Sequence, residues 1–255
     1  MTIDDIDMII VATVTPDYPV QSTACLVQHK MGARNVPSFD VNAACSGFIY
    51  SLTIAGSMIR SGIYKNVLVI GAEVLSRILD MTNRSNCILF GDGAAAAVVS
   101  EVEEGYGMLS TYLGAEGEDD YILKIPAGGS KKPNDAETIA NRENFLVMKG
   151  SEVFKFAVHA LPSATNKALK IANVKSEELK MIFPHQANVR IIESAAKRIH
   201  VPMEKFYMNI QRYGNTSAAS VGIALGEALE KGMLEKGDLI ALTGFGAGLT
   251  YGSIV

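Results

Sequence analysis

The sequence of 255 residues predicts an α/β fold made of two copies of one unit. Short apolar runs alternate with helical stretches, which is typical of parallel strands joined by helical crossovers. The order strand, helix, strand, turn, helix, strand occurs twice along the chain. Each copy then ends in a glycine-rich segment whose side chains alternate as they do in a strand.

The first copy opens with the apolar run MIIVA, which predicts a buried strand over residues 8–12. Its turn has the sequence NAACSG and separates a short strand from a long helix. The other elements expected in this copy are a helix at 22–31, a strand at 38–41, a helix at 46–61 and strands at 66–70 and 91–100. Gly32 and Gly62 mark the ends of the two helices.

The second copy opens with the run MIF after Lys180, and its turn has the sequence QRYGNTS. The other elements expected in it are a helix at 189–199, a strand at 206–210, a helix at 217–231 and strands at 238–242 and 244–255. The distance from the first strand to the turn is 36 residues in one copy (Ile9 to Cys45) and 33 in the other (Ile182 to Asn215). These similar spacings indicate an internal duplication.

The predicted elements divide the chain into an N-terminal half at 1–115, an excursion or linker at 116–150 and a C-terminal half at 151–255. The excursion is polar and contains GGSKKPND, which is typical of a loop. An amphipathic helix is expected at 152–171. Functional side chains in such folds gather beyond the carboxyl ends of the strands, so the two turns are the places to look for a site.

Composition and charge exclude several classes of protein. A net charge of −4 with scattered Lys and Arg residues speaks against a nucleic-acid binder. No stretch approaches the roughly 20 apolar residues that span a bilayer, and the N-terminus does not resemble a signal peptide. The three cysteines lack CxxC spacing, which favours free thiols in a reducing, cytoplasmic compartment. No spacing of histidines or carboxylates indicates a metal site.

Cys45 is the candidate nucleophile. It lies at the start of the helix expected at 46–61, where unpaired N–H groups and the helix dipole favour an anion and are expected to lower the pKa of the thiol. Small neighbouring residues leave room for a substrate. Cys25 and Cys87 are interpreted instead as small buried apolar residues.

His185 and Asn215 are expected to share the site with Cys45. His185 follows a strand at its carboxyl end, and Asn215 lies in the turn that corresponds to the one with Cys45. Approximate two-fold symmetry would bring the two helix starts face to face, with His185 between them. The other histidines lie on or at the ends of helices and are interpreted as surface or structural groups: His29, His159 and His200.

Five motifs occur in an order that is typical of one family: NAACSGF, FGDGAAA, PHQANVRI, YGNTSAAS and GFGAGLTYG. In them the chain resembles β-ketoacyl-acyl-carrier-protein synthase III, the initiating condensing enzyme of bacterial fatty acid synthesis, within the thiolase superfamily. The resemblance runs over essentially the whole chain. It implies a homodimer with a thiolase-like layered αβαβα architecture, in which pseudo-two-fold symmetry relates two mixed-sheet halves.

The resemblance also implies a decarboxylative Claisen condensation in two steps. Cys45 takes an acetyl or short branched acyl group from coenzyme A, and malonyl-acyl-carrier protein then loses carbon dioxide and attacks the acyl-cysteine. His185 and Asn215 would donate hydrogen bonds to the malonyl thioester oxygen, and the backbone N–H groups of Cys45 and Ala247 would form an oxyanion hole. Coenzyme A and the carrier's phosphopantetheine are parts of substrates, and no cofactor or metal is expected.

The remaining residues that the resemblance implicates would contact coenzyme A or the carrier protein. They are Arg84, Met148, Gly150, Phe154, Gln186, Ala187, Asn188 and Arg190, of which Arg190 would meet the acidic carrier. Val20 lies where the family often has an aromatic side chain that closes the acyl pocket across the dimer, so a roomier pocket is expected. The family also has a βα segment before the position of Met1, and without it an exposed sheet edge and apolar surface are expected.

Two other functions remain open at this point. Cys, His and Asn occur in the same order in papain-like cysteine proteases, although the sequence typical of their cysteine is missing and the chain has no Trp. An inactive or truncated homologue that acts only as a binding or interaction protein would keep the same motifs. A dinucleotide site at GFGAG is excluded, because the residues after it alternate like a strand and offer no helix N-terminus.

Overall fold

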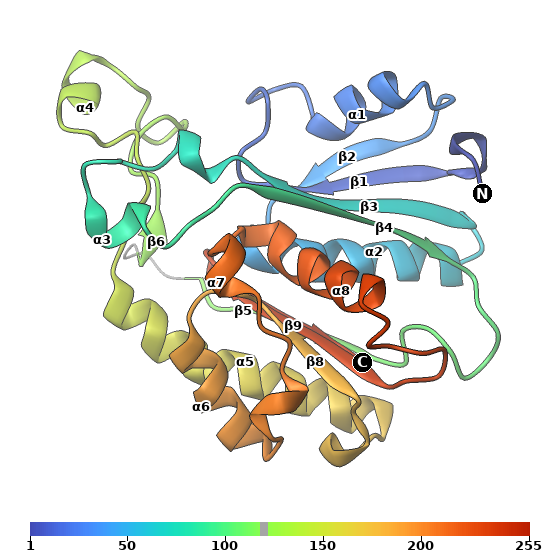
Figure 1. Ribbon diagram of the computed structural model, residues 1–255. Coiled ribbons are helices and arrows are strands. Elements are labelled where there is room, and N and C mark those ends of the chain that lie inside the picture. Colours follow the sequence, from blue (N-terminus) through green and yellow to red (C-terminus); the bar gives the residue numbers. More distant parts are fainter. Residues whose placement is uncertain (118–121) are drawn as a thin grey trace.

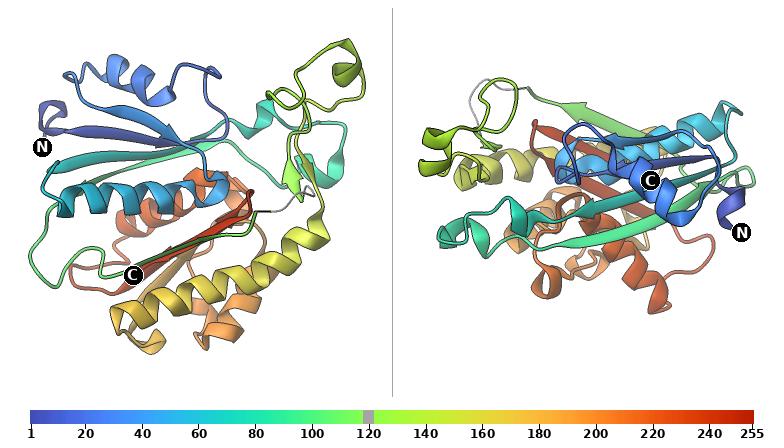
Figure 2. Two further views of the ribbon diagram at one scale, coloured as in Figure 1. Left: turned by 180° about the vertical axis from the view of Figure 1, so that it is seen from behind. Right: turned by 90° about the horizontal axis from the view of Figure 1, so that it is seen from above.

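The structure is a computed structural model that describes residues 1–117 and 122–255. It has five layers in the order helix, sheet, helix, sheet, helix (Figure 1). Helix α1 covers the outer face of the first sheet, α2 and α8 lie between the two sheets, and α5 and α6 cover the outer face of the second sheet (Figures 1 and 2). The predicted α/β class and the αβαβα layering are confirmed.

The first sheet has the strand order β2-β1-β3-β4, in which β4 is antiparallel to its neighbour and the other pairs are parallel. Its strands and helices are β1 (Met8–Ala12), α1 (Thr23–Met31), β2 (Ser38–Val41), α2 (Gly47–Arg60), β3 (Asn66–Glu73), α3 (Arg84–Cys87) and β4 (Gly93–Ser100). Apart from α3, which was not predicted, these bounds agree with the predicted ones within a few residues. Strand β1 is buried along its whole length, as its apolar sequence predicted.

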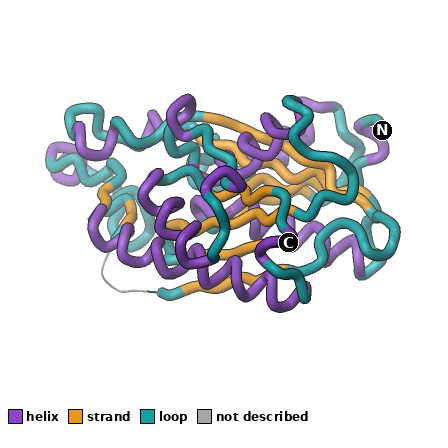
Figure 3. Tube along the Cα trace, turned by 60° about the horizontal axis from the view of Figure 1, so that its bottom comes forward, coloured by secondary structure: helices purple, strands orange, loops and turns teal. Residues whose placement is uncertain are grey.

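The second sheet has the strand order β5-β10-β9-β8. Its strands and helices are β5 (Thr111–Ala115), α5 (Gly150–Ala172), β8 (Met181–Pro184), α6 (Val189–Ile199), α7 (Ile210–Tyr213), α8 (Ser220–Glu230), β9 (Ile240–Gly246) and β10 (Thr250–Ile254). The excursion contains β6 (Leu123–Lys124), α4 (Ala136–Ala140) and β7 (Val147–Met148), and it projects from one end of the layers (Figure 1). Figure 3 shows the strands side by side, with helices and loops between and around the two sheets.

The two halves repeat one topology. Strands β1, β3 and β4 correspond in order and direction to β8, β9 and β10. The turns before α2 and α8 also share an unusual backbone conformation, because Ala44 has φ +45° and Ser217 has φ +48°, a region that few non-glycine residues adopt. The start of β1 lies 36 residues before Ala44 and the start of β8 lies 36 residues before Ser217, which supports the internal duplication.

Two segments differ from the prediction. Residues 111–115, which we counted with the N-terminal half, form β5 and pair with β10 in the second sheet. The strand expected at 206–210 is reduced to a single bridge at Phe206. The side chain of Gln186 binds the backbone N–H groups of Asn209 and Ile210, at the end of the expected strand. Residues 118–121 of the expected excursion lie outside the described residues.

The two halves approach each other closely because small residues line the contact. A methyl group built on Gly71 of β3 would lie 2.5 Å from the carbonyl oxygen of Ala218, in the turn before α8. One built on Gly246 of β9 would lie 2.6 Å from the backbone nitrogen of Cys45, in the turn before α2. Each turn therefore packs on a strand of the other half.

Strand β4 forms one edge of the first sheet, whereas β5 flanks the corresponding strand β10 in the second. Every other side chain of β4 is exposed, at Ala94, Ala96 and Val98. A row of small apolar side chains is therefore exposed along β4. Strand β4 also packs against the turn before α8, since a methyl group built on Gly93 would lie 3.2 Å from the side chain of Thr216.

Candidate active site

Cys45 lies in the 3-10 turn Ala44–Ser46 between β2 and α2 and is 6% exposed. It is the one buried cysteine of the three, since Cys25 is exposed and Cys87 is half-buried. The interpretation of Cys25 as a buried apolar residue is therefore wrong. Helix α1 packs on the first sheet through Ala24 and Val27, and Cys25 lies on its exposed face.

The thiol of Cys45 is protonated at neutral pH. Burial raises its pKa to about 12 and the charge of Glu73 also raises it, whereas the hydroxyl of Ser217 and the backbone N–H of Cys45 lower it. The lowered pKa that we expected from the start of α2 is wrong for this state, because burial removes the water that would solvate a thiolate. A nucleophilic role of Cys45 therefore requires that the thiolate forms in the course of the reaction.

His185 follows β8 directly and is 1% exposed. Its Nδ1 lies 2.7 Å from Ser220 Oγ, which also accepts a 3.5 Å hydrogen bond from the backbone N–H of Gln186. The Ser220 hydroxyl can therefore donate to Nδ1 and leave the ring proton on Nε2. Burial lowers the pKa of His185 to about 3, so the ring is neutral and Nε2–H can donate to a substrate oxygen.

Asn215 is held by its backbone and by its side-chain oxygen. Its N–H donates to Leu89 O at 2.9 Å, and its carbonyl accepts from Gly91 N at 2.9 Å. Its Oδ1 accepts from Ser217 N at 2.8 Å, which fixes the orientation of the amide. Nδ2 has no hydrogen-bond acceptor among the described residues, so both of its protons are available to a ligand.

Strand β9 packs against both Cys45 and His185. A methyl group built on Gly244 would lie 3.6 Å both from the carbonyl oxygen of Cys45 and from Cβ of His185. The ring of Phe245 meets the imidazole of His185 at 72°, with 5.3 Å between the ring centres. Asn215 lies two residues before Ser217, whose hydroxyl lowers the pKa of the Cys45 thiol. The structure thus brings the three predicted residues to one place between the halves.

Comparison with known proteins gives the family. The profile of 3-oxoacyl-[acyl-carrier-protein] synthase III matches residues 39–117, and the profile of the C-terminal part of that family matches residues 169–255. A β-ketoacyl-[acyl-carrier-protein] synthase III from Fusobacterium nucleatum is 67% identical over 252 residues, which cover 99% of this chain and 77% of the relative. This chain belongs to the 3-oxoacyl-acyl-carrier-protein synthase III family.

Other synthase III proteins are similar over the same length. One from Caldanaerobacter subterraneus is 54% identical over 99% of this chain and 76% of the relative. The crystal structure of the enzyme from Aquifex aeolicus superposes with a TM-score of 0.90 at 47% identity, covering 100% of this chain and 78% of the other. This likeness confirms the thiolase-like fold that the motifs implied.

Most synthase III positions implicated in coenzyme A or carrier binding are accessible. Arg84, Gly150, Phe154, Asn188 and Arg190 are exposed, and Met148 and Ala187 are half-buried. Helix α3, strand β7 and the start of α5 lie at the same end of the molecule (Figure 1). The side chain of Asn188 also caps α6, because its Oδ1 accepts from Arg190 N at 2.9 Å. Their contacts with substrates remain a prediction.

Gln186 does not fit the ligand-binding role that we expected. It is 1% exposed, and its Nε2 donates to the carbonyl oxygens of Pro184 (2.9 Å) and Tyr207 (3.0 Å). Its Oε1 accepts from the backbone N–H groups of Asn209 and Ile210 at 3.1 and 3.2 Å. Because every hydrogen-bonding position of the amide is used within the chain, Gln186 is a structural residue.

Two other predicted site residues lie in loops. Ala247 is half-buried in the turn between β9 and β10, next to the Gly246 that packs on Cys45. Val20 is 99% exposed in the loop before α1, so it lines no pocket within its own chain. Its expected role in the acyl pocket requires a second copy of the chain and stays a prediction.

Sequence reasoning missed three residues beside the site. Ser217 and Ser220 lie in the motif GNTSAAS, and their position next to Asn215 was a signal that could have found them. Glu73, at the end of β3, gave no such signal. It is buried and accepts hydrogen bonds from the hydroxyls of Thr13 (3.3 Å) and Thr15 (2.7 Å), close enough for its charge to raise the pKa of Cys45.

The described residues contain no group of three or more His, Cys, Asp or Glu side chains that could hold a metal ion. No helix in the described part of the chain combines the length and the apolar character needed to cross a membrane. Both findings concern residues 1–117 and 122–255 only.

Proposed function

We propose that this chain condenses an acyl-coenzyme A primer with malonyl-acyl-carrier protein and so initiates fatty acid synthesis. Family membership supports this reaction, since relatives up to 67% identical are β-ketoacyl-[acyl-carrier-protein] synthases III. One structural observation carries the proposal. A single buried site between the halves combines a cysteine, a neutral imidazole and an amide with two unused donors.

The first step is transfer of the acyl group to Cys45. The thiol loses its proton, the sulfur attacks the thioester carbonyl, and coenzyme A leaves as a thiol after taking up a proton. The backbone N–H groups of Cys45 and Ala247 would hold the oxyanion of the tetrahedral intermediate. The tight packing of Gly246 on the nitrogen of Cys45 supports this pair, because it sets the two chain segments side by side.

The second step is decarboxylation followed by condensation. His185 Nε2–H and Asn215 Nδ2–H would bind the malonyl thioester oxygen, where charge accumulates as carbon dioxide leaves and the bonding electrons form an enolate. The enolate carbon then attacks the acyl-cysteine carbonyl, the sulfur leaves and regains a proton, and 3-oxoacyl-acyl-carrier protein is released. The low pKa of His185 supports its role, because a neutral ring donates a hydrogen bond without carrying a full charge.

The partners in this proposal are the acyl-coenzyme A primer, malonyl-acyl-carrier protein and a second copy of the chain. Arg190 is exposed in the first turn of α6, where a basic side chain could meet an acidic carrier. The reaction needs no cofactor besides the groups that the substrates bring. A cytoplasmic location belongs to the same proposal and is supported by the three free thiols.

Acyl transfer to Cys45 tests the proposal directly. The protein is incubated with radiolabelled acetyl-coenzyme A, and the peptide with Cys45 is examined by mass spectrometry. We expect one acyl group on wild type and on a Cys25→Ser control, and none on Cys45→Ser. Malonyl-acyl-carrier protein is then added. We expect His185→Ala and Asn215→Ala to be acylated like wild type but to release about a hundredfold less carbon dioxide.

The other functions considered from the sequence give different results in this experiment. A cysteine protease would cleave a peptide substrate, and carbon dioxide would not be released from the malonyl thioester. A protein that only binds would retain acyl-coenzyme A without a covalent bond to Cys45. Absence of covalent acylation in wild type would therefore reject the condensing activity for this chain.

A further inference from the structure

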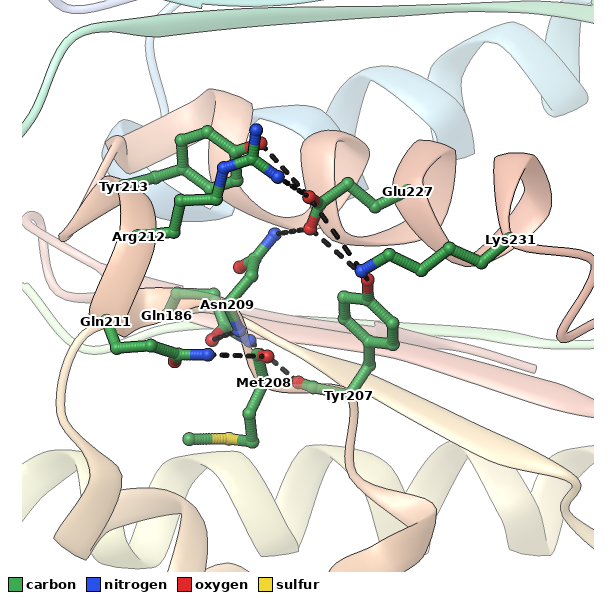
Figure 4. A network of polar contacts seen from close by, with 9 residues as sticks. All are labelled: Gln186, Tyr207, Met208, Asn209, Gln211, Arg212, Tyr213, Glu227 and Lys231. Atoms are coloured by element: carbon green, nitrogen blue, oxygen red, sulfur yellow. Dashed lines mark hydrogen bonds and ion pairs between the residues drawn. The ribbon is translucent and has the colours of Figure 1, made fainter.

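The carboxylate of Glu227, on α8, is the centre of a polar network with residues 207–213 (Figure 4). Its two oxygens accept hydrogen bonds from Tyr207 Oη (3.2 Å), Asn209 Nδ2 (2.8 Å), Arg212 Nη1 (3.1 Å) and Tyr213 Oη (3.0 Å). Lys231, one turn further along α8, donates to Tyr207 Oη at 2.8 Å. The amide of Asn209, then Tyr213, the charge of Lys231 and Tyr207 lower the pKa of Glu227, so the carboxylate is charged at neutral pH.

Helix α8 also contacts His185 through its first residue. Ser220 is the first residue of α8 and lies two turns before Glu227. Its hydroxyl lies 2.7 Å from Nδ1 of His185 and sets the tautomer of the ring. One helix therefore bears both the partner of His185 and the centre of the Glu227 network.

Gln186 supplies a third connection. It follows His185 in the chain, and its amide binds the carbonyl of Tyr207 and the N–H groups of Asn209 and Ile210. The segment that Gln186 binds is the same segment that Glu227 holds on α8. His185, residues 207–213 and α8 are thus joined pairwise into a closed frame.

The segment 207–213 leads directly into the turn of Asn215. Tyr213, which donates to Glu227, lies two residues before Asn215. The backbone of Asn215 also pairs with Leu89 and Gly91, so the turn has support of its own when the network is weakened. We therefore expect a weakened network to shift the position of Asn215 relative to His185. The fold of the turn should persist.

We propose that Glu227 is a positioning residue, which fixes the separation of the hydrogen-bond donors of His185 and Asn215 by holding residues 207–213 against α8. This inference rests on the proposed function, because it assigns those two donors to one substrate oxygen. Two donors act together on one oxygen only when both lie at hydrogen-bond distance, and a shift of a fraction of an ångström in either weakens the pair. Glu227 contacts neither the thiol nor the substrate groups, so acylation of Cys45 does not depend on it.

The test replaces Glu227 by Gln and measures the two half-reactions separately. A Gln amide has one acceptor oxygen where the carboxylate has two, so part of the network loses its acceptor while the side chain keeps its size. We expect acylation of Cys45 by acetyl-coenzyme A to stay within about twofold of wild type. The kcat of carbon dioxide release from malonyl-acyl-carrier protein should fall about tenfold, with an unchanged KM.

Glu230→Gln is the matched control. Glu230 lies on the same helix, is exposed and has no hydrogen bond or ion pair among the described residues. The control should keep both half-reactions at the wild-type rate. Should Glu227→Gln fail to fold, Tyr213→Phe removes a single hydroxyl of the network and is expected to slow the same step by a smaller factor.

The possible results separate the two proposals. A wild-type protein that is not acylated rejects the proposed function itself. An active wild type with Glu227→Gln equal to Glu230→Gln rejects only the positioning role. A parallel fall of both half-reactions in proportion to the folded fraction also rejects it, since that result shows that Glu227 supports only folding.

Discussion

At Cys45 two opposing effects act on one thiol. The hydroxyl of Ser217 and the backbone N–H of Cys45 favour a thiolate, and burial disfavours it. Burial dominates, because its effect carries the pKa upward to about 12 in spite of the hydroxyl of Ser217 and the backbone N–H of Cys45. Cys45, the proposed nucleophile, is thus a neutral thiol that oxidants and alkylating agents attack slowly.

Alkylation rates test this state of Cys45. The thiolate is the reactive form, and below the pKa its fraction rises about tenfold for each pH unit. The rate of modification of Cys45 by iodoacetamide should therefore keep rising between about pH 7 and pH 9 without a plateau. Mass spectrometry of the Cys45 peptide follows it in a Cys25→Ser/Cys87→Ser background. A plateau near neutral pH would show that the helix dipole, not burial, controls the thiol.

At the level of elements, the site depends on how closely a turn of one half approaches a strand of the other. The carbonyl of Ala218 leaves no room for a methyl group on Gly71, and the nitrogen of Cys45 leaves none on Gly246. The turns themselves adopt a positive φ at Ala44 and Ser217, a conformation that costs energy and persists because both halves pack around it. Close packing of strand and turn is therefore what holds the catalytic groups in place.

Gly71→Ala tests this packing. Its new methyl group would meet the backbone of Ala218, which cannot move as a flexible side chain can, so the unfolding free energy should fall by about 1–3 kcal/mol and condensation should be lost. Urea unfolding measures the loss of stability, and carbon dioxide release measures the loss of condensation.

Gly226→Ala is the control, because nothing lies within 4 Å of a methyl group there. It lies inside α8 and should raise stability by about 0.5–1 kcal/mol. A stable, active Gly71→Ala protein would contradict the proposed role of the close approach.

At the level of the whole molecule, the proposed acyl pocket needs a second copy of the chain. Val20 is fully exposed and contacts no pocket of its own chain, so any effect of this residue on substrate choice has to act across an interface between two chains. The homodimer and the roomier acyl pocket thus form one joint proposal. One substitution can test both together.

Val20→Phe should restrict the acyl pocket. We expect the ratio of kcat/KM for isobutyryl- over acetyl-coenzyme A to fall about tenfold or more, because a few methylene groups in a pocket change such ratios by that amount. Val102→Phe is the control, since Val102 is also exposed but lies after β4, away from this loop. Sedimentation measures whether both variants form dimers. An unchanged ranking of acetyl, butyryl and isobutyryl primers in a dimeric Val20→Phe protein would refute the proposed pocket.

Most of the architecture was predictable because its signals are local. The apolar run of β1, the glycine after α1 and the helix at 189–199 are set by neighbouring residues, and the structure has all three as predicted. The strand expected at 206–210 was wrong, and the side chain of Gln186 binds the backbone N–H groups at the end of that segment. A local sequence pattern carries no information about a hydrogen-bond partner 23 or 24 residues away.

The sequence by itself determined the two duplicated α/β units and the family, and its short motifs gave Cys45, His185 and Asn215 as the candidate catalytic residues. Only the tertiary structure decided the protonation states of Cys45 and His185, the structural role of Gln186 and the connection of Glu227 to the site. The physical reason is that burial and hydrogen bonding depend on neighbours in space. Here those neighbours come from the other half of the chain or from distant elements of the same half.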